Sequence, residues 1–477
     1  MAFHSLYIAG DWSRADNARL NINPSNLDDV VGEYSEASAA DVDRAVAAAA
    51  EAAASWGRSG PQQRFDVLDF IGTEILARKE ELGRLLAREE GKILAEAIGE
   101  VTRAGYIFKF FAGEALRAGG EALPSVRPGI EVLTSREPVG VVGLITPWNF
   151  PIAIPAWKTA PALAYGNSVV LKPSELTPGC AWALAEIISR SGLPKGVFNL
   201  VMGGGEAGAA LVAHRGISAI SFTGSSAIGA RIARQCAEDG KKYQLEMGGK
   251  NPLLVMDDAD LGLAVECAAN GAFYSTGQRC TASSRIIVTK GIYGRFLDAL
   301  AERTKTLRVG DALDPASQIG PAVDERQMAK NRQYEEMIEA DGGRLVARGT
   351  CITTGQRGHF FAPVLVANDN ALARLNQEEI FGPIATVIRA NDYDDALSIA
   401  NDTPFGLSAG ICTNSLGLAA RFRRDAQAGM VMVNAPTAGV DYHVPFGGSK
   451  ASSQGPREQG RMAGEFYTRV KTHYVCA

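Results

Sequence analysis

The sequence predicts an α/β protein built on parallel sheets, and three observations support this fold class. From residue 139 onward, short apolar runs end in Gly, Pro or Ser. These runs are apolar throughout instead of alternating with polar residues, which is typical of strands buried on both faces of a sheet. Helical stretches separate the runs, and strands that alternate with helices indicate βα units.

The predicted elements fall into an N-terminal helical region and two alternating blocks. Residues 40–118 are rich in Ala, Glu, Arg and Leu at amphipathic helical spacing. In the first block, strands are predicted at 139–146, 167–173, 196–203 and 217–224, and helices at 181–192 and 208–216. In the second block, strands are predicted at 251–258, 284–291, 385–390 and 429–435, and helices at 260–274, 292–307 and 394–402. No flexible linker separates the blocks, so we expect tightly packed domains.

The bulk composition is that of a globular enzyme and excludes several classes of partner. The chain has 477 residues, of which 46% are hydrophobic and 21% are charged. This length predicts about three domains or subdomains. The net charge of -5 argues against a nucleic-acid or anionic-membrane partner, because such partners require a basic face. An acidic substrate stays possible, since a pocket needs only one or two local cations.

The N-terminus and the cysteines favour a cytoplasmic protein. The first residues, MAFHSLYIAGDWS, lack the basic and apolar regions of a signal peptide, and the apolar runs are too short to span a membrane. The seven cysteines and five histidines show no close spacing that suggests disulfides or a metal site. We therefore expect a protein of the reducing cytoplasm without a metal.

Cys280 and Glu246 are the most informative residues. Cys280 lies in FYSTGQRCTASS, and Glu246 lies 34 residues upstream in LEMGGKNP. A thiolate can add to a carbonyl carbon, and a carboxylate can activate the water that hydrolyses the resulting thioester. Each residue alone also fits a plainer interpretation, as a buried core cysteine and an exposed turn glutamate.

Two upstream segments complete the pattern. ITPWNFP contributes Asn149, and VVLKPSE contributes Lys172. An amide and a lysine in these settings are typical of a nicotinamide-dependent enzyme. Together the four segments resemble the aldehyde dehydrogenase superfamily, and the resemblance extends over essentially the whole chain.

The resemblance implies an aldehyde dehydrogenase fold and an assembly. It implies a Rossmann-like NAD(P)-binding domain of residues 1–118 and 139–248, and an α/β catalytic domain of residues 249–448. The segments 119–138 and 449–477 would form a small β arm for oligomerisation, in a homodimer or homotetramer.

The resemblance also assigns catalytic roles to Cys280, Glu246, Asn149 and Lys172. Cys280 is the nucleophile, and Asn149 stabilises the oxyanion together with the backbone N–H of Cys280. Glu246 is the base for hydrolysis. Family members that transfer the acyl group to coenzyme A usually lack this glutamate, so a free acid is the expected product. The other six cysteines are interpreted as structural.

The implied cofactor is NAD, with NADP possible. Lys172 and Glu175 would hydrogen-bond the adenosine ribose, and Glu175 would repel the 2′-phosphate of NADP. The glycines of 203–208 match a dinucleotide fingerprint, but no acidic residue follows at the expected distance, so the pyrophosphate is expected at 222–229. The expected cofactor contacts are Ile145, Thr146, Pro147, Trp148, Lys172, Ser174, Glu175, Gly204, Gly208, Phe222, Thr223, Gly224, Ser225, Ile228, Gln327, Glu379 and Phe381.

The expected substrate is a small, carboxylated aldehyde. Segments such as PIAIPAWKTAPALAYGN resemble family members that oxidise 2-oxoglutarate semialdehyde (2,5-dioxopentanoate) to 2-oxoglutarate. Arg103 stands at a helix position that faces the substrate tunnel in the resembled fold, where a guanidinium can bind a carboxylate. The alternative for Arg103 is a surface ion pair with Glu100 at i, i+3. Arg279 and Arg285 are lesser candidates for the same role.

Other functions stay open. Succinate semialdehyde dehydrogenase and a broad-range aldehyde dehydrogenase are alternatives within the family. Glu246 disfavours an enzyme that makes acyl-coenzyme A, and the joint presence of the four catalytic residues disfavours a structural protein without activity.

Overall fold

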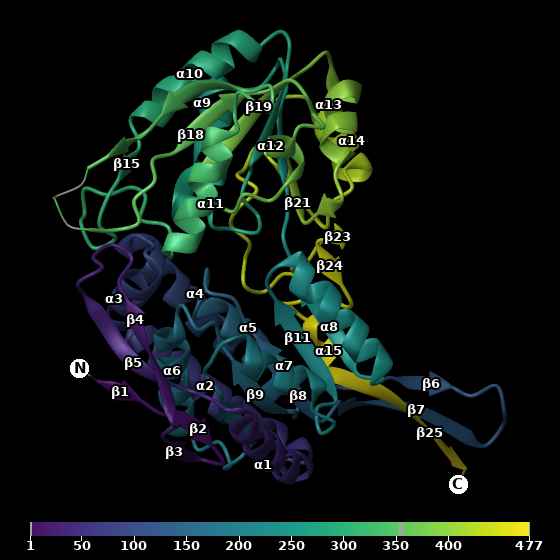
Figure 1. The fold of residues 1–477 in the computed structure, drawn as a ribbon. Helices are drawn as coiled ribbons and strands as arrows, with labels where there is room; N and C mark the ends of the chain where they lie inside the picture. Colours follow the sequence, from purple (N-terminus) through teal and green to yellow (C-terminus); the bar gives the residue numbers. More distant parts are fainter. Residues whose placement is uncertain (1, 353–354, 356, 477) are drawn as a thin grey trace.

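Two mostly parallel sheets organise the chain, as the computed structural model shows for residues 2–352, 355 and 357–476 (Figure 1). The predicted α/β class is confirmed. In the first sheet the strand order is β24 (Ser453–Gln454), β12 (Lys242–Glu246), β11 (Ala219–Thr223), β8 (Val141–Ile145), β9 (Ser168–Lys172), β10 (Phe198–Leu200), β2 (Leu6–Ile8) and β3 (Asp11–Ser13). The strands from β12 to β10 run parallel, and β24, β2 and β3 extend the sheet antiparallel.

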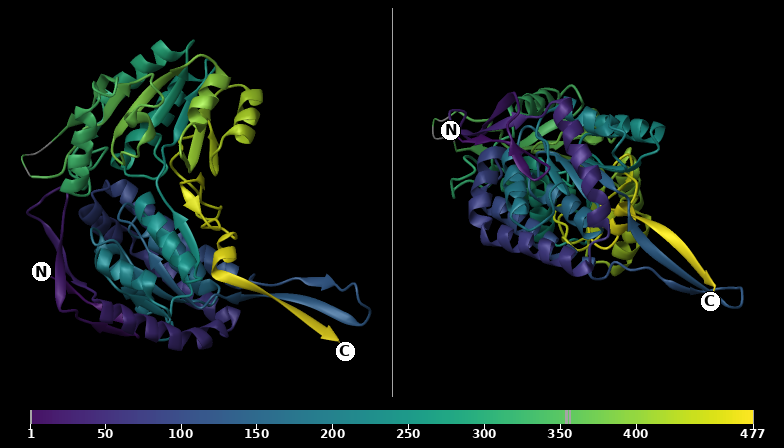
Figure 2. Two further views of the ribbon diagram at one scale, coloured as in Figure 1. Left: turned by 45° about the vertical axis from the view of Figure 1, so that its right-hand side comes forward. Right: turned by 90° about the horizontal axis from the view of Figure 1, so that it is seen from below.

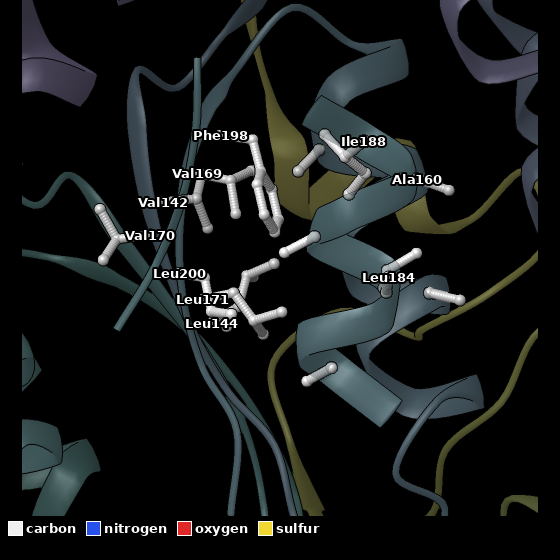
Figure 3. Close-up of a cluster of buried hydrophobic side chains, with 14 of the residues drawn as sticks. Val142, Leu144, Ala160, Val169, Val170, Leu171, Leu184, Ile188, Phe198 and Leu200 are labelled. Carbon is white, nitrogen blue, oxygen red and sulfur yellow. The ribbon is translucent and has the colours of Figure 1, made fainter. Parts of the chain in front are cut away.

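Helices cover both faces of the first sheet. One face packs on α5 (Ala153–Ala164) and α6 (Pro178–Ser189), and the sheet also contacts α1 (Ala39–Gly57), α7 (Gly205–Ala213) and α8 (Ser226–Glu238). Figure 3 shows Val169 and Phe198 directed toward Ile188 of α6, while Val170 points to the opposite face. Strands β8, β9 and β11 are buried along their whole length, so the continuously apolar runs mark core strands as predicted.

The second sheet forms the other half of the molecule. Its strand order is β16 (Arg344–Arg348), β18 (Val364–Ala367), β19 (Ile384–Ala390), β14 (Arg285–Thr289), β13 (Pro252–Val255), β21 (Ser408–Cys412) and β22 (Met430–Val433). All of its pairs are parallel except β16 with β18. The helices of this half are α9 (Leu261–Phe273), α10 (Tyr293–Lys305), α11 (Glu325–Glu336), α12 (Arg374–Gln377), α13 (Tyr393–Asn401) and α14 (Leu416–Asp425). Strands β12, β18 and β21 lie outside the predicted runs.

The N-terminal helical region is confirmed and is preceded by a small sheet. That sheet pairs β5 (Val30–Glu36) with β1 (Phe3–His4) and β4 (Asn17–Ile22). Helix α1 begins with a capping box, in which Ser38 and Asp41 satisfy each other's backbone N–H groups. It is followed by α2 (Pro61–Ala77), α3 (Lys79–Glu90) and α4 (Leu94–Ala115). Helix α4 packs on α2, α3 and α5, which brings its side chains next to the loop after β8.

A β arm projects from the body of the molecule (Figure 2). It pairs β25 (Thr468–Cys476) with β7 (Ile130–Pro138), and β7 with β6 (Ala122–Pro124). Within the predicted arm segment 449–477, however, β24 joins the first sheet, β23 (Ser449–Lys450) pairs with β20 (Phe405–Gly406), and α15 (Ala463–Tyr467) packs on α5. The C-terminal segment therefore contributes to more of the fold than an arm alone.

The described helices and acidic, cysteine and histidine side chains bear on membrane and metal binding. Among those residues no helix is long and apolar enough to cross a membrane, and no group of three or more His, Cys, Asp or Glu side chains is arranged to hold a metal ion.

Candidate active site

A cavity of about 2010 Å³ brings the predicted site residues together from both sheets. The first half contributes the loops after β8, β9 and β11, and the second half contributes the segments around Cys280, α11 and Phe381. The loops of the first half follow the carboxyl ends of parallel strands, which is where ligands bind in open α/β sheets, whereas the segments around Cys280 and Phe381 precede β14 and β19. The volume exceeds that of an ordinary small-ligand pocket, so it can hold a dinucleotide beside a small substrate.

Cys280 lies on the cavity wall at the end of a strained turn. The turn η1 (Tyr274–Gly277) carries positive φ angles at Ser275 (49°), Thr276 (58°) and Gly277 (64°). Such angles are costly for residues other than glycine and persist only where surrounding contacts hold them. Here Thr276 Oγ1 donates to the carbonyl of Gly320 at 3.0 Å, and Asn251 Nδ2 donates to the carbonyl of Cys280 at 2.8 Å. The turn therefore fixes where the thiol lies.

Asn149 approaches Cys280 from the other half of the molecule. It is buried in the loop between β8 and α5, and its Nδ2 donates to the carbonyl of Gln278 at 2.9 Å. The amide has a second N–H, and Asn149 lines the same cavity as Cys280. This arrangement suits stabilisation of negative charge on an oxygen bound next to the thiol.

The thiol of Cys280 requires activation in this environment. Burial raises its pKa to about 12, with further contributions from the carboxylates of Glu379 and Glu246, while the guanidinium of Arg103 acts in the opposite direction. The protonated thiol therefore predominates at neutral pH, although the thiolate is the reactive form.

Glu246 ends β12 beside the cavity, but its carboxyl group points away from it. The adjacent Met247 and Gly248 line the cavity, whereas Glu246 Oε2 accepts a hydrogen bond from Ser453 Oγ of β24. Burial raises the pKa of Glu246 well above its usual value, and the neighbouring carboxylate of Glu458 adds to this effect. To reach a substrate on Cys280, the Glu246 side chain has to turn toward the cavity.

The predicted cofactor contacts belong to the same cavity. All of them line it except Gly204, whose neighbour Gly205 does so instead. Lys172 Nζ donates to the carbonyls of Pro173 and Gly203, each at 2.7 Å, and lies 4.0 Å from Glu175 Oε2. Burial lowers the pKa of Lys172 to about 8. Ser225 stands at the N-cap of α8 on the cavity wall, so the free N–H groups of that helix can meet a phosphate.

Glu379 and Phe381 also line the cavity, and contacts with other segments hold them there. Glu379 Oε1 accepts from the backbone N–H of Gly249 at 3.0 Å, and Lys330 Nζ donates to the carbonyl of Glu379 at 2.9 Å. Phe381 adopts a φ of 61° and packs edge-on against Trp148, with 5.4 Å between ring centroids. These contacts hold an aromatic edge and a carboxylate at the middle of the cavity.

The three candidate arginines are separated by the fold. Arg103 lines the cavity, its Nη2 donates to Gln459 Oε1 at 3.0 Å, and its guanidinium lies 5.5 Å from the Trp157 ring centroid. The surface ion pair with Glu100 is wrong, because Glu100 is buried and pairs with Lys92.

The other two arginines are less suitable. Arg279 lines the cavity but is paired with Glu96 at 2.8 Å. Arg285 does not face the cavity: it is fully buried in β14 and donates to the backbone carbonyls of Ile399 and Ala400. The prediction that Arg285 could bind the substrate is therefore wrong.

Several cavity residues had no signal in the sequence. Trp157 and Val440 line the cavity, and Lys92 and Glu100 form a buried ion pair behind Asn149. An apolar residue in a loop or a charged residue in a helix is ordinary in sequence. Only the contacts across the fold give these residues a place at the site.

Comparison with known proteins is consistent over the whole chain. The model of the aldehyde dehydrogenase family matches residues 12–473. The alpha-ketoglutaric semialdehyde dehydrogenase of Bacillus subtilis is 42% identical over 98% of this chain and 97% of its own length. The 2,5-dioxopentanoate dehydrogenase of Saccharolobus solfataricus is 39% identical over 98% of each chain.

A solved structure has the same architecture. The betaine aldehyde dehydrogenase of Staphylococcus aureus in complex with NAD+ superimposes with a TM-score of 0.95 at 35% sequence identity, over 99% of this chain and 95% of that chain.

Proposed function

The chain belongs to the aldehyde dehydrogenase family, and from this premise we propose that it oxidises 2-oxoglutarate semialdehyde to 2-oxoglutarate with NAD. Two relatives of this name match over nearly their full length. The observation in the chain itself that carries the substrate assignment is Arg103, a cation on the wall of the cavity that contains Cys280.

Arg103 is suited to bind the carboxylate at the far end of a short semialdehyde. Arg103 and Cys280 line the same cavity, so a short semialdehyde bound at the thiol can extend toward the guanidinium. Gln459 accepts a hydrogen bond from Nη2, which leaves other N–H groups of the guanidinium on the cavity wall. Donors are thus left for a carboxylate. A cationic substrate such as betaine aldehyde would be repelled by the same group.

The oxidation begins at Cys280. Its thiol releases its proton to solvent and the thiolate adds to the aldehyde carbon, and the resulting oxyanion accepts hydrogen bonds from Asn149 Nδ2 and from the backbone N–H of Cys280. NAD, when bound, supplies the hydride acceptor. Loss of hydride from the adduct re-forms a C=O bond, which leaves the acyl group on Cys280 as a thioester.

Hydrolysis requires Glu246. Its carboxylate accepts a proton from water, the water oxygen attacks the thioester carbon, and the acid departs as Cys280 recovers its thiol. Glu246 has to leave Ser453 for this step, and the burial that raises its pKa makes its carboxylate a better proton acceptor. Because Glu246 can activate water, we expect the product to be a free acid and not an acyl-coenzyme A.

The residues around the cavity fit NAD. Lys172 and Glu175 lie together where an adenosine ribose would be held, and Ser225 at the start of α8 lies where a pyrophosphate would be held. A carboxylate at Glu175 favours the free 2′-hydroxyl of NAD over the 2′-phosphate of NADP. NADP is the second candidate cofactor.

The β arm supports a homodimer or homotetramer. Val470 and Tyr474 of β25 are 62% and 63% exposed in the single chain. Apolar side chains on a projecting strand are covered when a second copy packs on them. We also propose that the enzyme works in the cytoplasm, where its thiol nucleophile stays reduced.

A panel of aldehydes tests the proposal. Reduction of NAD and of NADP is followed with 2-oxoglutarate semialdehyde, succinate semialdehyde, propanal and betaine aldehyde, each with and without coenzyme A. We expect the highest kcat/KM for 2-oxoglutarate semialdehyde with NAD, no requirement for coenzyme A, and 2-oxoglutarate as product. A preference for propanal or betaine aldehyde would overturn the role of Arg103, and formation of an acyl-coenzyme A would overturn hydrolysis.

A further inference from the structure

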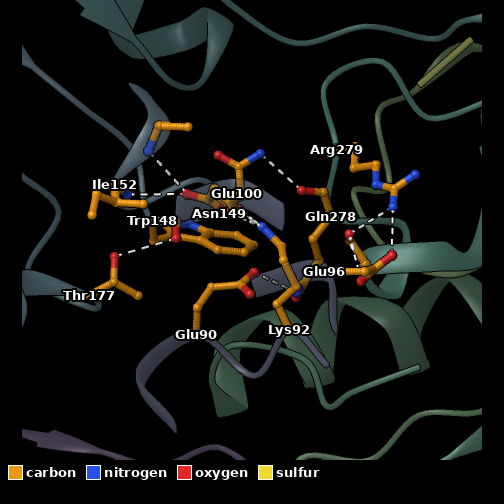
Figure 4. Close-up of polar contacts among 12 residues, drawn as sticks. Glu90, Lys92, Glu96, Glu100, Trp148, Asn149, Ile152, Thr177, Gln278 and Arg279 are labelled. Carbon is orange, nitrogen blue, oxygen red and sulfur yellow. Dashed lines mark hydrogen bonds and ion pairs between the residues drawn. The ribbon is translucent and has the colours of Figure 1, made fainter. Parts of the chain in front are cut away.

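A buried ion pair lies directly behind the loop that carries Asn149 (Figure 4). Lys92 Nζ and Glu100 Oε2 are 2.7 Å apart, and both side chains are 2% exposed. Lys92 follows α3 after Gly91, whose φ of 93° turns the chain, and Glu100 belongs to α4. Burying two charges is unfavourable unless additional hydrogen bonds satisfy them. The additional hydrogen bonds of this ion pair are all made with the backbone of residues 149–153.

Lys92 holds the backbone of Asn149. Its Nζ donates to the Asn149 carbonyl at 2.7 Å and lies 3.8 Å from the centroid of the Phe150 ring. Burial acts to lower the pKa of Lys92, but the nearby carboxylates of Glu100 and Glu90 outweigh it and keep the pKa above its usual value. Lys92 is therefore a charged donor at neutral pH, and charge-assisted hydrogen bonds are the stronger kind.

Glu100 holds the other end of the same segment. Its Oε1 accepts from the backbone N–H groups of Ile152 and Ala153, each at 3.2 Å. These groups stand at the start of α5, where Ile152 provides no side-chain cap, so Glu100 supplies the missing acceptor from another helix. The two members of one ion pair thus fix both ends of residues 149–153.

We propose that Lys92 and Glu100 are positioning residues, which hold the Asn149 amide where it can stabilise the oxyanion on Cys280. The proposal rests on the proposed role of Asn149. With the Asn149 carbonyl and the start of α5 fixed, the amide is oriented by its own two side-chain torsions and by its bond to the Gln278 carbonyl at 2.9 Å. Loss of the Lys92 bond frees the loop, and a displacement of about 1 Å in a reacting geometry can cost about 100-fold in rate.

The test is a double-mutant cycle on the full-length enzyme with the aldehyde that the panel selects. The variants are Lys92→Met, Asn149→Ala and the two combined, and the readout is the burst rate of nicotinamide reduction at saturating substrate and NAD. We expect Lys92→Met alone to lower the burst rate roughly 10- to 100-fold with a change in KM below about threefold. In the Asn149→Ala background, we expect the same substitution to change the burst rate less than about threefold, because the amide that Lys92 positions is already absent.

Two outcomes overturn the proposal in different ways. An equal loss in both backgrounds, or no loss in either, means that Lys92 does not act through Asn149, and it leaves the role of Asn149 intact. An unchanged burst rate in Asn149→Ala itself removes Asn149 as an oxyanion donor, and the positioning proposal fails with it.

A second double-mutant cycle controls for damage to the fold. Lys92→Met leaves Glu100 buried without its cation, which can unfold a protein. Glu100→Gln keeps an acceptor for the N–H groups of Ile152 and Ala153 and removes the charge that Lys92 requires. Its cycle with Asn149→Ala is expected to show the same non-additive effects, whereas additive effects overturn the proposal. Lys92→Arg, which preserves a charged donor, should recover part of the burst rate lost in Lys92→Met.

Discussion

Replacing Arg103 with Met should lower kcat/KM for an acidic aldehyde far more than kcat/KM for a neutral aldehyde. The substitution keeps an apolar side chain of similar length and removes the guanidinium, which lies 5.5 Å from the Trp157 ring centroid, from the cavity wall. An acidic semialdehyde then loses its partner for the distal carboxylate. A neutral aldehyde loses no such partner, and a desolvated cation is removed from its path.

The magnitude follows from the contacts that Arg103 has available. One N–H group is used by Gln459 at 3.0 Å, and because Arg103 lines the cavity, another N–H group of the guanidinium can bind the carboxylate. A hydrogen bond to a charged group contributes about 1.5–3 kcal/mol. Since about 1.4 kcal/mol corresponds to a factor of ten, kcat/KM for 2-oxoglutarate semialdehyde should fall roughly 10- to 150-fold.

The assay is nicotinamide reduction with 2-oxoglutarate semialdehyde and with propanal, measured side by side. We expect a large loss on the first substrate and a change below about threefold on the second. Arg279→Met is the matched control, because Arg279 also lines the cavity but is paired with Glu96 at 2.8 Å. It should not reproduce the selective loss.

Either of two results would refute the reasoning about Arg103. An equal loss on both aldehydes would mean that the substitution damages the fold or the cofactor end of the cavity. No loss on either would mean that Arg103 is not a substrate ligand. A selective loss in Arg279→Met alone would transfer the role to Arg279.

Four further predictions concern the chemistry. Cys280→Ser should abolish dehydrogenase activity and leave NAD binding nearly intact, because an alcohol is far less nucleophilic than a thiolate; steady turnover by this variant would remove Cys280 from the mechanism. Glu246→Gln should give a burst of about one reduced cofactor per active site followed by slow turnover, since the amide is no base; an unchanged steady-state rate would point to another base. Glu175→Ser should raise the use of NADP relative to NAD, and an unmoved preference measured with both cofactors would mean that Glu175 does not contact the ribose. Alkylation of Cys280 by iodoacetamide should accelerate from about pH 7 to about pH 9 without a plateau, because the pKa of the thiol is raised to about 12. Glu379→Gln removes a negative charge that raises this pKa, so alkylation of that variant at fixed pH should be faster. Arg103→Met removes a positive charge that lowers the pKa, so alkylation of that variant should be slower.

The sequence predicted most of the fold because the core strands are marked locally. Strands β8, β9, β11 and β14 are buried along their whole length, and each coincides with an apolar run that ends near Gly, Pro or Ser. Strand β12 was not predicted, because its sequence KYQLE is mostly polar. The two-residue strand β24 pairs with it at the edge of the sheet. A strand whose partner lies far along the chain has no local signature of burial.

Much of the cavity lining was predictable for a related reason. Many of its residues in the first half stand after parallel strands, in short motifs whose glycines, lysine and carboxylates have recognisable chemistry. All but Gly204 of the predicted contacts line the cavity. Loops after neighbouring parallel strands meet at one edge of a sheet, so local motifs became neighbours in space.

The sequence by itself determined the α/β class, the nucleophile motif around Cys280 and the segments that surround the cavity. The tertiary structure decided which side chains face which partners. It joined Arg103 to Gln459 across 356 positions, turned Glu246 toward Ser453, buried Arg285 away from the cavity, and set Lys92 and Glu100 behind Asn149. The physical reason is that strand propensity and turn chemistry act over a few residues, whereas burial, charge pairing and pKa depend on groups that only folding brings together.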